Sequence, residues 1–153
     1  MLKRSGELPY VPFFRNSDLM VMGRYGLKKE ERLSGKKQME KLFREGKSFF
    51  LSPFRVVVLE EAGHNGRPPV RMAITVPRKL FRRAVKRNLI KRRVKEAYRL
   101  NKSLLADPLQ EKGVNMDVIF IYTSPEILSS RDIEDKIVLS LQKILRDYEK
   151  SAH

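Results

Sequence analysis

One stretch of the sequence concentrates the side chains best suited to bind phosphate. Between residues 78 and 99 there are eleven Lys or Arg residues and one acid, Glu96, so this window carries +10 of the chain's net charge of +15. An ordinary solvated helix alternates Glu with Lys, and pairs four residues apart offset the repulsion. Because that compensation is missing here, the pattern predicts a polyanionic partner that neutralises the stretch.

Most of this window falls in a predicted helix over residues 84–105. Its apolar residues gather on one side at helical spacing: Ile90, Val94, Ala97, Tyr98, Leu104 and Leu105. Asn88, Arg92, Lys95 and Arg99 fall on the opposite side, so the helix has a core side and a cationic side. Arg also suits bidentate phosphate contacts. Either DNA or RNA fits this charge pattern. The candidate nucleic-acid-binding residues are Arg78, Lys79, Arg82, Arg83, Lys86, Arg87, Asn88, Lys91, Arg92, Lys95 and Arg99.

Residues for catalysis by the polypeptide itself are scarce. The only histidines are His64 and His153, and the absence of Cys excludes disulfides, thiolate zinc sites and cysteine nucleophiles. No phosphate-binding glycine loop or HExxH motif is present. The acids that a free-standing metal-dependent nuclease would need fall in pairs or in the last helix: Glu30, Glu31, Glu60, Glu61, Asp132, Glu134 and Asp135. Solvated faces and strand ends explain these acids better than a metal site.

The length of 153 residues, 41% of them hydrophobic, fits one domain with its own core. We expect a flexible N-terminal extension over residues 1–28, rich in Pro and Gly, and a single domain over 29–150 that binds the nucleic acid. No apolar run resembles a signal peptide or a membrane span. The sequence therefore predicts a cytoplasmic protein that does not contact a membrane.

The first half of the domain predicts one helix and two strands. The segment 34–46 reads as a short amphipathic helix, with Ser34 as its cap and Gly46 at its end. Strands are expected over 54–60 and 71–77, joined as a hairpin through a loop that contains Gly and Pro.

The second half supplies the central strand and the last helix. After the cationic helix, a break around Pro108 and Gly113 leads to a strand over 117–123, whose continuous apolar run suits burial on both faces. Ser129 opens the final helix and forms a capping box with Asp132. The order helix-strand-strand-helix-strand-helix predicts an α+β sandwich with a central sheet.

Two elements away from the cationic helix carry aromatic residues that suit an unpaired nucleic-acid strand. Phe43 on the first helix and Phe54 at the start of the first predicted strand could supply a stacking surface. Each is also a reasonable core residue, because amphipathic stripes usually face inward.

The segment "AVKRNLIKRRVKEAYR", residues 84–99, resembles the signature of the protein subunit of bacterial ribonuclease P, as does "RMAITVPRK" before it. The order of elements also matches, over roughly residues 32–148. The resemblance implies a protein that pairs with a catalytic RNA subunit to remove the 5′ leader of precursor tRNA. It implies that the RNA and its Mg²⁺ ions perform the hydrolysis, so the protein itself holds no catalytic residue or metal.

The resemblance also implies two RNA contacts. Arg87, Asn88, Lys91 and Arg92 fall on the motif that faces the RNA subunit, and Arg78 with Lys79 form the basic pair after the strand. A cleft between the first helix and the sheet holds the leader, and its residues here are Met39, Phe43 and Phe54.

Two positions depart from the family pattern. Met39 replaces an aromatic residue of the first helix, so a softer apolar contact replaces stacking. Leu89 replaces the second Arg of the motif, which leaves Arg93 as the candidate to compensate.

The family fold carries a left-handed strand-helix-strand crossover, which periodicity alone does not predict. No obligate protein partner is expected. The alternative reading from charge is a ribosomal or general RNA-binding protein without a role in cleavage.

Overall fold

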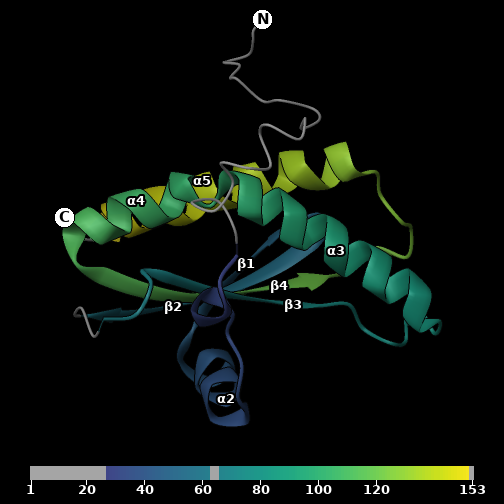
Figure 1. Cartoon of the computed structure of the whole chain (residues 1–153), viewed down its shortest axis with the longest axis horizontal. Helices are drawn as coiled ribbons and strands as arrows, with labels where there is room; N and C mark the ends of the chain where they lie inside the picture. The colour runs from purple at the N-terminus through teal and green to yellow at the C-terminus, as the bar shows by residue number, and fades with distance from the viewer. Residues whose placement is uncertain (1–26, 63–65, 152–153) are drawn as a thin grey trace, which may run out of the picture.

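A four-stranded sheet separates the helices into two layers (Figure 1). Helix α2 (Lys36–Glu45) lies on one face, and α3 (Ala84–Asn101), α4 (Ser103–Lys112) and α5 (Ser130–Ser151) cover the other. The strands are β1 (Lys47–Leu51), β2 (Phe54–Ala62), β3 (Val70–Thr75) and β4 (Val114–Tyr122), and a 3-10 turn, η2 (Lys29–Glu31), precedes α2. The predicted α+β class is confirmed.

This computed structural model describes residues 27–62 and 66–151. Almost all of the predicted N-terminal extension, and both histidines, lie outside the described residues. Leu27, the first described residue, packs against the core.

The sheet order is β1-β2-β4-β3, and it corrects the predicted hairpin. β2 does not pair with β3, because β4 lies between them, antiparallel to β2 and parallel to β3. The hairpin partner of β2 is β1, a strand that the sequence did not predict. The central position of β4 is confirmed, since residues 115–120 are all buried.

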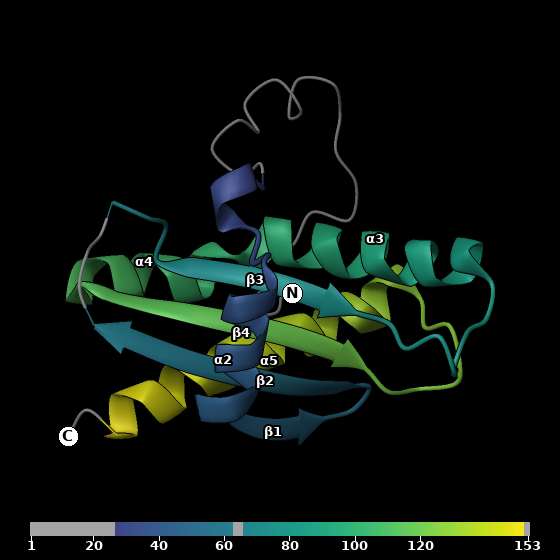
Figure 2. The same cartoon turned by 90° about the horizontal axis from the view of Figure 1, so that it is seen from below.

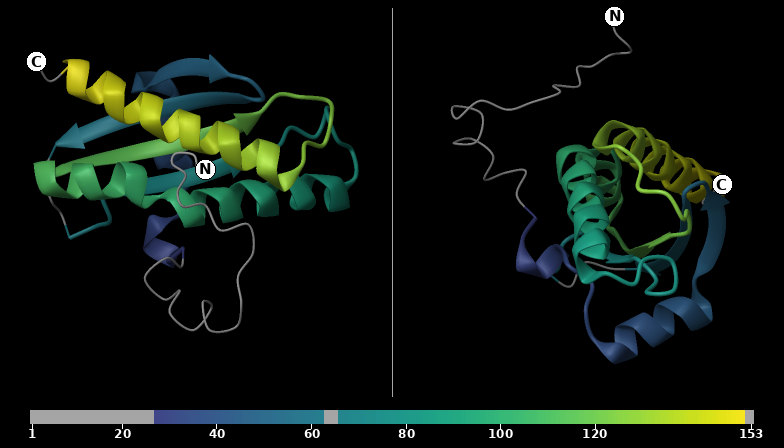
Figure 3. Two further views of the ribbon diagram at one scale, coloured as in Figure 1. Left: turned by 90° about the horizontal axis from the view of Figure 1, so that it is seen from above. Right: turned by 90° about the vertical axis from the view of Figure 1, so that its right-hand side faces the viewer.

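The connection between the parallel strands passes through α3 and α4 on one face. Figure 2 and the left view of Figure 3, seen from opposite faces of the sheet, both show this crossover to be left-handed, as the resemblance implied. The predicted single helix over 84–105 is instead two helices that meet at Lys102. Pro108 does not interrupt helical structure, because it lies inside α4. This helix ends at its C-cap, Gly113, which has the left-handed conformation with φ of 69°.

Strand alternation divides the core into two clusters. Phe54, Val56, Val118 and Phe120 point toward α3 and α5 in the larger cluster. The smaller cluster lies under α2, where Leu42 and Leu33 pack on Val57 and Ile119. The two faces of the same strands therefore have different partners.

The two predicted helix caps have different outcomes. Ser129 Oγ accepts a hydrogen bond of 3.1 Å from the backbone N–H of Asp132, so this cap is confirmed. The Ser34 cap is wrong, because Gly35 occupies the N-cap of α2, with φ of 100° and no side-chain hydrogen bond.

The end of α2 at Gly46 is confirmed, and the packing there requires glycine. Its N–H donates to the Leu42 carbonyl at 2.8 Å. A Cβ atom at this position would lie 2.5 Å from the Leu42 oxygen, 2.9 Å from Val57 Cγ1 and 3.0 Å from the Val58 oxygen. Backbone atoms supply two of these contacts, so the site cannot relax by rotating a side chain.

We expect Gly46→Ala to lower the free energy of unfolding by about 1–3 kcal/mol, as overpacking does. Urea unfolding monitored by circular dichroism measures this change. Ser34→Ala is the control, because its side chain caps nothing, and it should stay within about 0.5 kcal/mol of the wild type. An unchanged midpoint for Gly46→Ala would contradict the close approach of α2 to β2.

Candidate nucleic-acid interface

Helix α3 has the two sides that its sequence predicts, but Leu104, which was also predicted on the core side, lies in α4 and is exposed. Ile90, Val94, Ala97 and Tyr98 are buried in the larger core cluster. Asn88, Arg92 and Lys95 are exposed on the opposite side. The apolar side therefore fixes the helix against the domain and turns the cationic side toward solvent.

Most cations of this segment have no carboxylate partner in the part of the chain that the structure describes. The exposed cations without an ion pair there are Arg78, Lys79, Arg82, Arg83, Lys86, Lys91, Arg92 and Lys95. Neighbouring like charges within a Debye length of about 10 Å repel one another. We call these eight residues, together with Asn88, the cationic surface.

The start of α3 adds a second unfavourable term. Its first turn holds no acid, and the N-cap residue, Arg83, makes no side-chain capping bond. A helix N-terminus carries partial positive charge and favours anions, yet Lys86 lies in this first turn. An external anion would relieve both this repulsion and that between the side chains.

Three arginines of the same segment serve the protein's own structure. Arg87 Nη1 donates to the carbonyls of Phe81 at 2.8 Å and Arg82 at 2.7 Å, which fixes the connection before α3. Arg99 pairs with Glu96, and its side chain is 15% exposed. Arg93 Nη1 donates to the Leu128 carbonyl at 2.6 Å, so its guanidinium holds the loop before α5. The predicted compensation of Leu89 by Arg93 therefore has no support, and the cationic surface is defined without these three.

The three residues predicted to line the leader cleft differ in burial and in the face of the sheet on which they lie. Phe43 on α2 is 52% exposed, and Met39 packs partly against the smaller cluster. Phe54 is 0% exposed and corrects the prediction, because alternation along β2 turns it to the opposite face of the sheet. There its ring packs edge-on to Phe120 and Tyr122, at 5.8 Å between centroids in each case.

A network of ion pairs holds α2 and the chain before β3 on this face. The Asp117 carboxylate, 0% exposed, accepts two bonds from Arg71, at 2.9 and 3.0 Å, and one from Arg67 at 3.1 Å. Arg67 also bonds Glu61 at 3.0 Å, and Lys41 reaches Glu61 at 2.7 Å. That last hydrogen bond lowers the pKa of the Glu61 carboxyl and raises the pKa of the Lys41 amine. The network is internally paired, unlike the cationic surface.

Two exposed residues on the α2 side were missed by the sequence reasoning. Phe50 on β1 is 64% exposed, and Arg55 on β2 is exposed directly opposite it. The available signal was the pair of aromatic residues in "KSFFL" before Pro53, since aromatic residues are enriched in strands.

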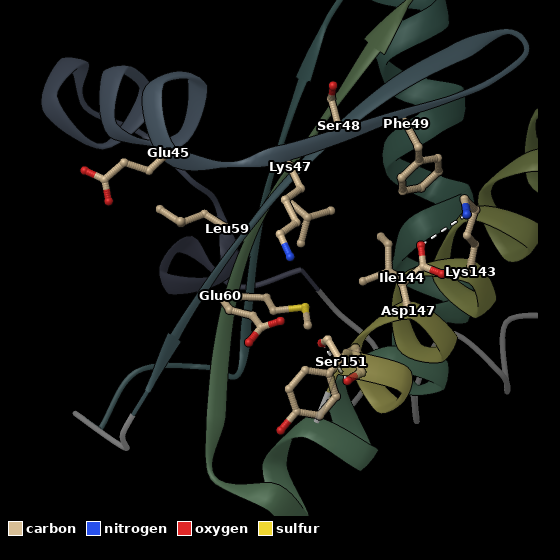
Figure 4. A pocket seen from close by; sticks show the side chains of 13 residues that line it. Glu45, Lys47, Ser48, Phe49, Leu59, Glu60, Lys143, Ile144, Asp147 and Ser151 are labelled. Carbon is tan, nitrogen blue, oxygen red and sulfur yellow. Dashed lines mark hydrogen bonds and ion pairs between the residues drawn. The ribbon is translucent and has the colours of Figure 1, made fainter. Parts of the chain in front are cut away.

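A cavity of about 540 Å³ lies between β1, β2 and the C-terminal half of α5 (Figure 4). Phe49 and Ile144 supply apolar lining, whereas Lys143 pairs with Asp147 at 3.1 Å across one turn of α5. Glu60 adds a further acid. Because acids and cations are mixed here, the cavity does not extend the cationic surface.

The acids considered for a nuclease are dispersed. Within residues 27–62 and 66–151, no three His, Asp or Glu side chains are grouped so that they could hold a metal ion. Lys102 bonds Glu31 at 2.9 Å, and Asn101 Nδ2 donates to Glu134 at 2.8 Å. Over the same residues, no helix has the length and apolar character to cross a bilayer.

Comparisons with known sequences match most of the chain. A family model described as Ribonuclease P matches residues 27–146. The chain is 41% identical over 128 residues to the ribonuclease P protein component of Porphyromonas gingivalis, which covers 84% of this chain and 93% of that protein. It is 37% identical over 89 residues to that of Dictyoglomus turgidum, which covers 58% of this chain and 71% of that protein.

Solved structures are similar over the same region. The RNase P protein from Thermotoga maritima aligns with a TM-score of 0.59 and 27% identity, covering 74% of this chain and 96% of that one. The RNase P protein of Staphylococcus aureus aligns with a TM-score of 0.58, covering 75% and 97%; at 24% identity this likeness concerns the fold alone. The matched region contains both α3 and the α2 face.

Proposed function

We propose that this chain, which belongs to the ribonuclease P protein family, binds the catalytic RNA subunit of ribonuclease P and the 5′ leader of precursor tRNA. In this proposal it acts as the protein subunit of an endoribonuclease and assists removal of the leader. The RNA subunit and its Mg²⁺ ions carry out the hydrolysis, and the protein contributes binding. We place this activity in the cytoplasm.

The observation that carries the proposal is the cationic surface, which spans α3 and the connection before it. Its exposed Lys and Arg side chains have no carboxylate partner in the described part of the chain, so they are available to phosphates. Phosphates that pair with them release counterions from the RNA, which supplies affinity and makes it depend on salt. Affinity for a large RNA thus compensates the repulsion that the free protein tolerates.

The α2 face supports the second contact. Phe43 exposes half of its side chain to solvent on a short helix that Leu42 anchors to the sheet. An exposed aromatic ring offers a stacking position to an unpaired base of any identity, which suits a leader of variable sequence. The matched family, together with this division into two surfaces, favours the ribonuclease P reading over a general RNA-binding protein.

Two neighbouring arginines test the contact with the RNA subunit. We expect Arg92→Ala to flatten the slope of log affinity against log salt by roughly 0.7–0.9, since it removes one phosphate contact, and to leave stability unchanged. Arg93→Ala should do the reverse. It should lower the free energy of unfolding by about 1–3 kcal/mol, because Leu128 loses its charged donor, without changing the slope.

Salt-dependent binding to the RNA subunit and urea unfolding of both variants provide the measurements. Equal slopes for the wild type and Arg92→Ala would show that this side chain does not contact a phosphate. Because both variants lose one positive charge, the comparison separates position from net charge.

The leader contact makes a separate prediction for Phe43→Ala. If the ring stacks on a leader base, the holoenzyme should bind precursor tRNA more weakly by about 1–3 kcal/mol and bind mature tRNA as before. Phe43→Tyr should retain the stacking and restore the affinity. An equal loss for both tRNAs, or a loss of folding, would assign Phe43 to the protein's own structure.

A further inference from the structure

A row of four residues crosses the whole sheet beside α2. Phe50 on β1 pairs with Arg55 on β2, Arg55 with Ile121 on β4, and Ile121 with Thr75 on β3. Paired residues on neighbouring strands share one face of a sheet. Val57, two residues after Arg55, packs beneath α2, so the row lies on the α2 face.

Helix α2 leaves part of this row uncovered. The helix packs on the adjacent row through Leu42, which contacts Val57 and Ile119. Figure 2 shows α2 crossing the middle of the sheet, with the ends of β3 and β4 beyond it. Phe50 is 64% exposed, and Arg55 is also exposed. Ile121 and Thr75, the other two residues of the row, are half-buried.

The packing of the fold does not require an aromatic residue at Phe50 or a cation at Arg55, the two exposed residues of the row. Phe49, the neighbour of Phe50, turns to the other face, where it packs against the core and beneath Lys143 at 5.1 Å. Phe50 has no such packing. Arg55 makes no ion pair or hydrogen bond in the described part of the chain, although Arg67 and Arg71 on the same face are both paired.

The position of the row connects the two surfaces described above. Phe43 is exposed on α2, the helix that borders the open region, and the row ends at Thr75, just before Arg78 and Lys79 of the cationic surface. A solvent-exposed aromatic ring beside an unpaired cation, continuing into further cations, is the combination that binds a single strand by stacking and phosphate contact.

We propose that Phe50 and Arg55 bind one further unpaired nucleotide of the leader, at a position separate from that at Phe43. The base stacks on the Phe50 ring, and the Arg55 guanidinium contacts its phosphate. The strand then runs from the α2 face toward Arg78 and Lys79. This inference rests on the proposed function and adds a subsite to it.

The test measures binding of precursor tRNAs to the reconstituted holoenzyme, with leaders lengthened one nucleotide at a time. We expect Phe50→Ala to weaken binding roughly fivefold or more, but only once the leader reaches the subsite. The length at which the loss appears should differ from that for Phe43→Ala. For Arg55→Ala, the loss of binding should appear at the same leader length as for Phe50→Ala. This variant should also flatten the slope of log affinity against log salt by roughly 0.7.

Three control variants keep the result interpretable. Phe50→Tyr should restore binding, because the ring is retained. Ser48→Ala, exposed on β1 and on the same face, should bind like the wild type. Urea unfolding of Phe50→Ala should match the wild type, since its side chain is mostly exposed.

Different failures have different meanings. If Phe50→Ala binds every leader like the wild type while Phe43→Ala remains leader-dependent, the subsite is wrong and the proposed function stands. If neither variant depends on the leader, the proposed leader contact fails as well. If sedimentation shows that the wild-type protein self-associates and Phe50→Ala does not, Phe50 belongs to a protein interface and the subsite is overturned.

Discussion

Burial of the apolar side of α3 holds the like charges of its other side close together, and this repulsion is the constraint on which the rest of the molecule depends. Ile90, Val94 and Tyr98 are almost completely buried and so fix the helix to the domain. Each buried side chain of this size contributes about 1.5–3 kcal/mol, which exceeds the repulsion between exposed charges in water. The core can therefore present a one-signed surface that an isolated helix could not maintain.

The distribution of acids keeps that surface unpaired. Asp117 and Glu61 bind Arg71, Arg67 and Lys41 on the α2 face, far along the sheet from the start of α3. Glu31 binds Lys102 where α3 meets α4. These carboxylates therefore form ion pairs away from the start of α3. Within residues 78–99 the one acid is Glu96, which pairs with Arg99. The result is a domain whose excess charge is concentrated where an RNA backbone can reach it.

Periodicity predicted the elements whose burial is local. The apolar side of α3, the central strand β4 and the Ser129 cap of α5 each follow from residues within a single segment. Strand pairing is not local, so the hairpin between β2 and β3 was wrong: β4 enters between them from later in the chain.

The candidate site was predicted in the same uneven way. The charges of α3 were visible in the sequence, but the internal hydrogen bonds of Arg87 and Arg93 depend on carbonyls placed by the fold. Phe54 entered the cleft through the family resemblance, whereas its alternative as a core residue is what the structure shows, and Phe50 was missed because β1 was not expected. The left-handed crossover entered through the family resemblance, since periodicity carries no information on handedness.

The absence of cysteine from the sequence allows one direct measurement of where RNA lies on this protein. Asn88→Cys places a unique thiol on the exposed side of α3 without removing a charge, and Leu139→Cys places one on the exposed side of α5. A hydroxyl-radical source tethered to each thiol in the reconstituted holoenzyme should cut the RNA subunit locally from residue 88 and weakly or not at all from residue 139. Intact assembly with no cutting from residue 88, or equal cutting from both, would contradict phosphate binding by the cationic surface.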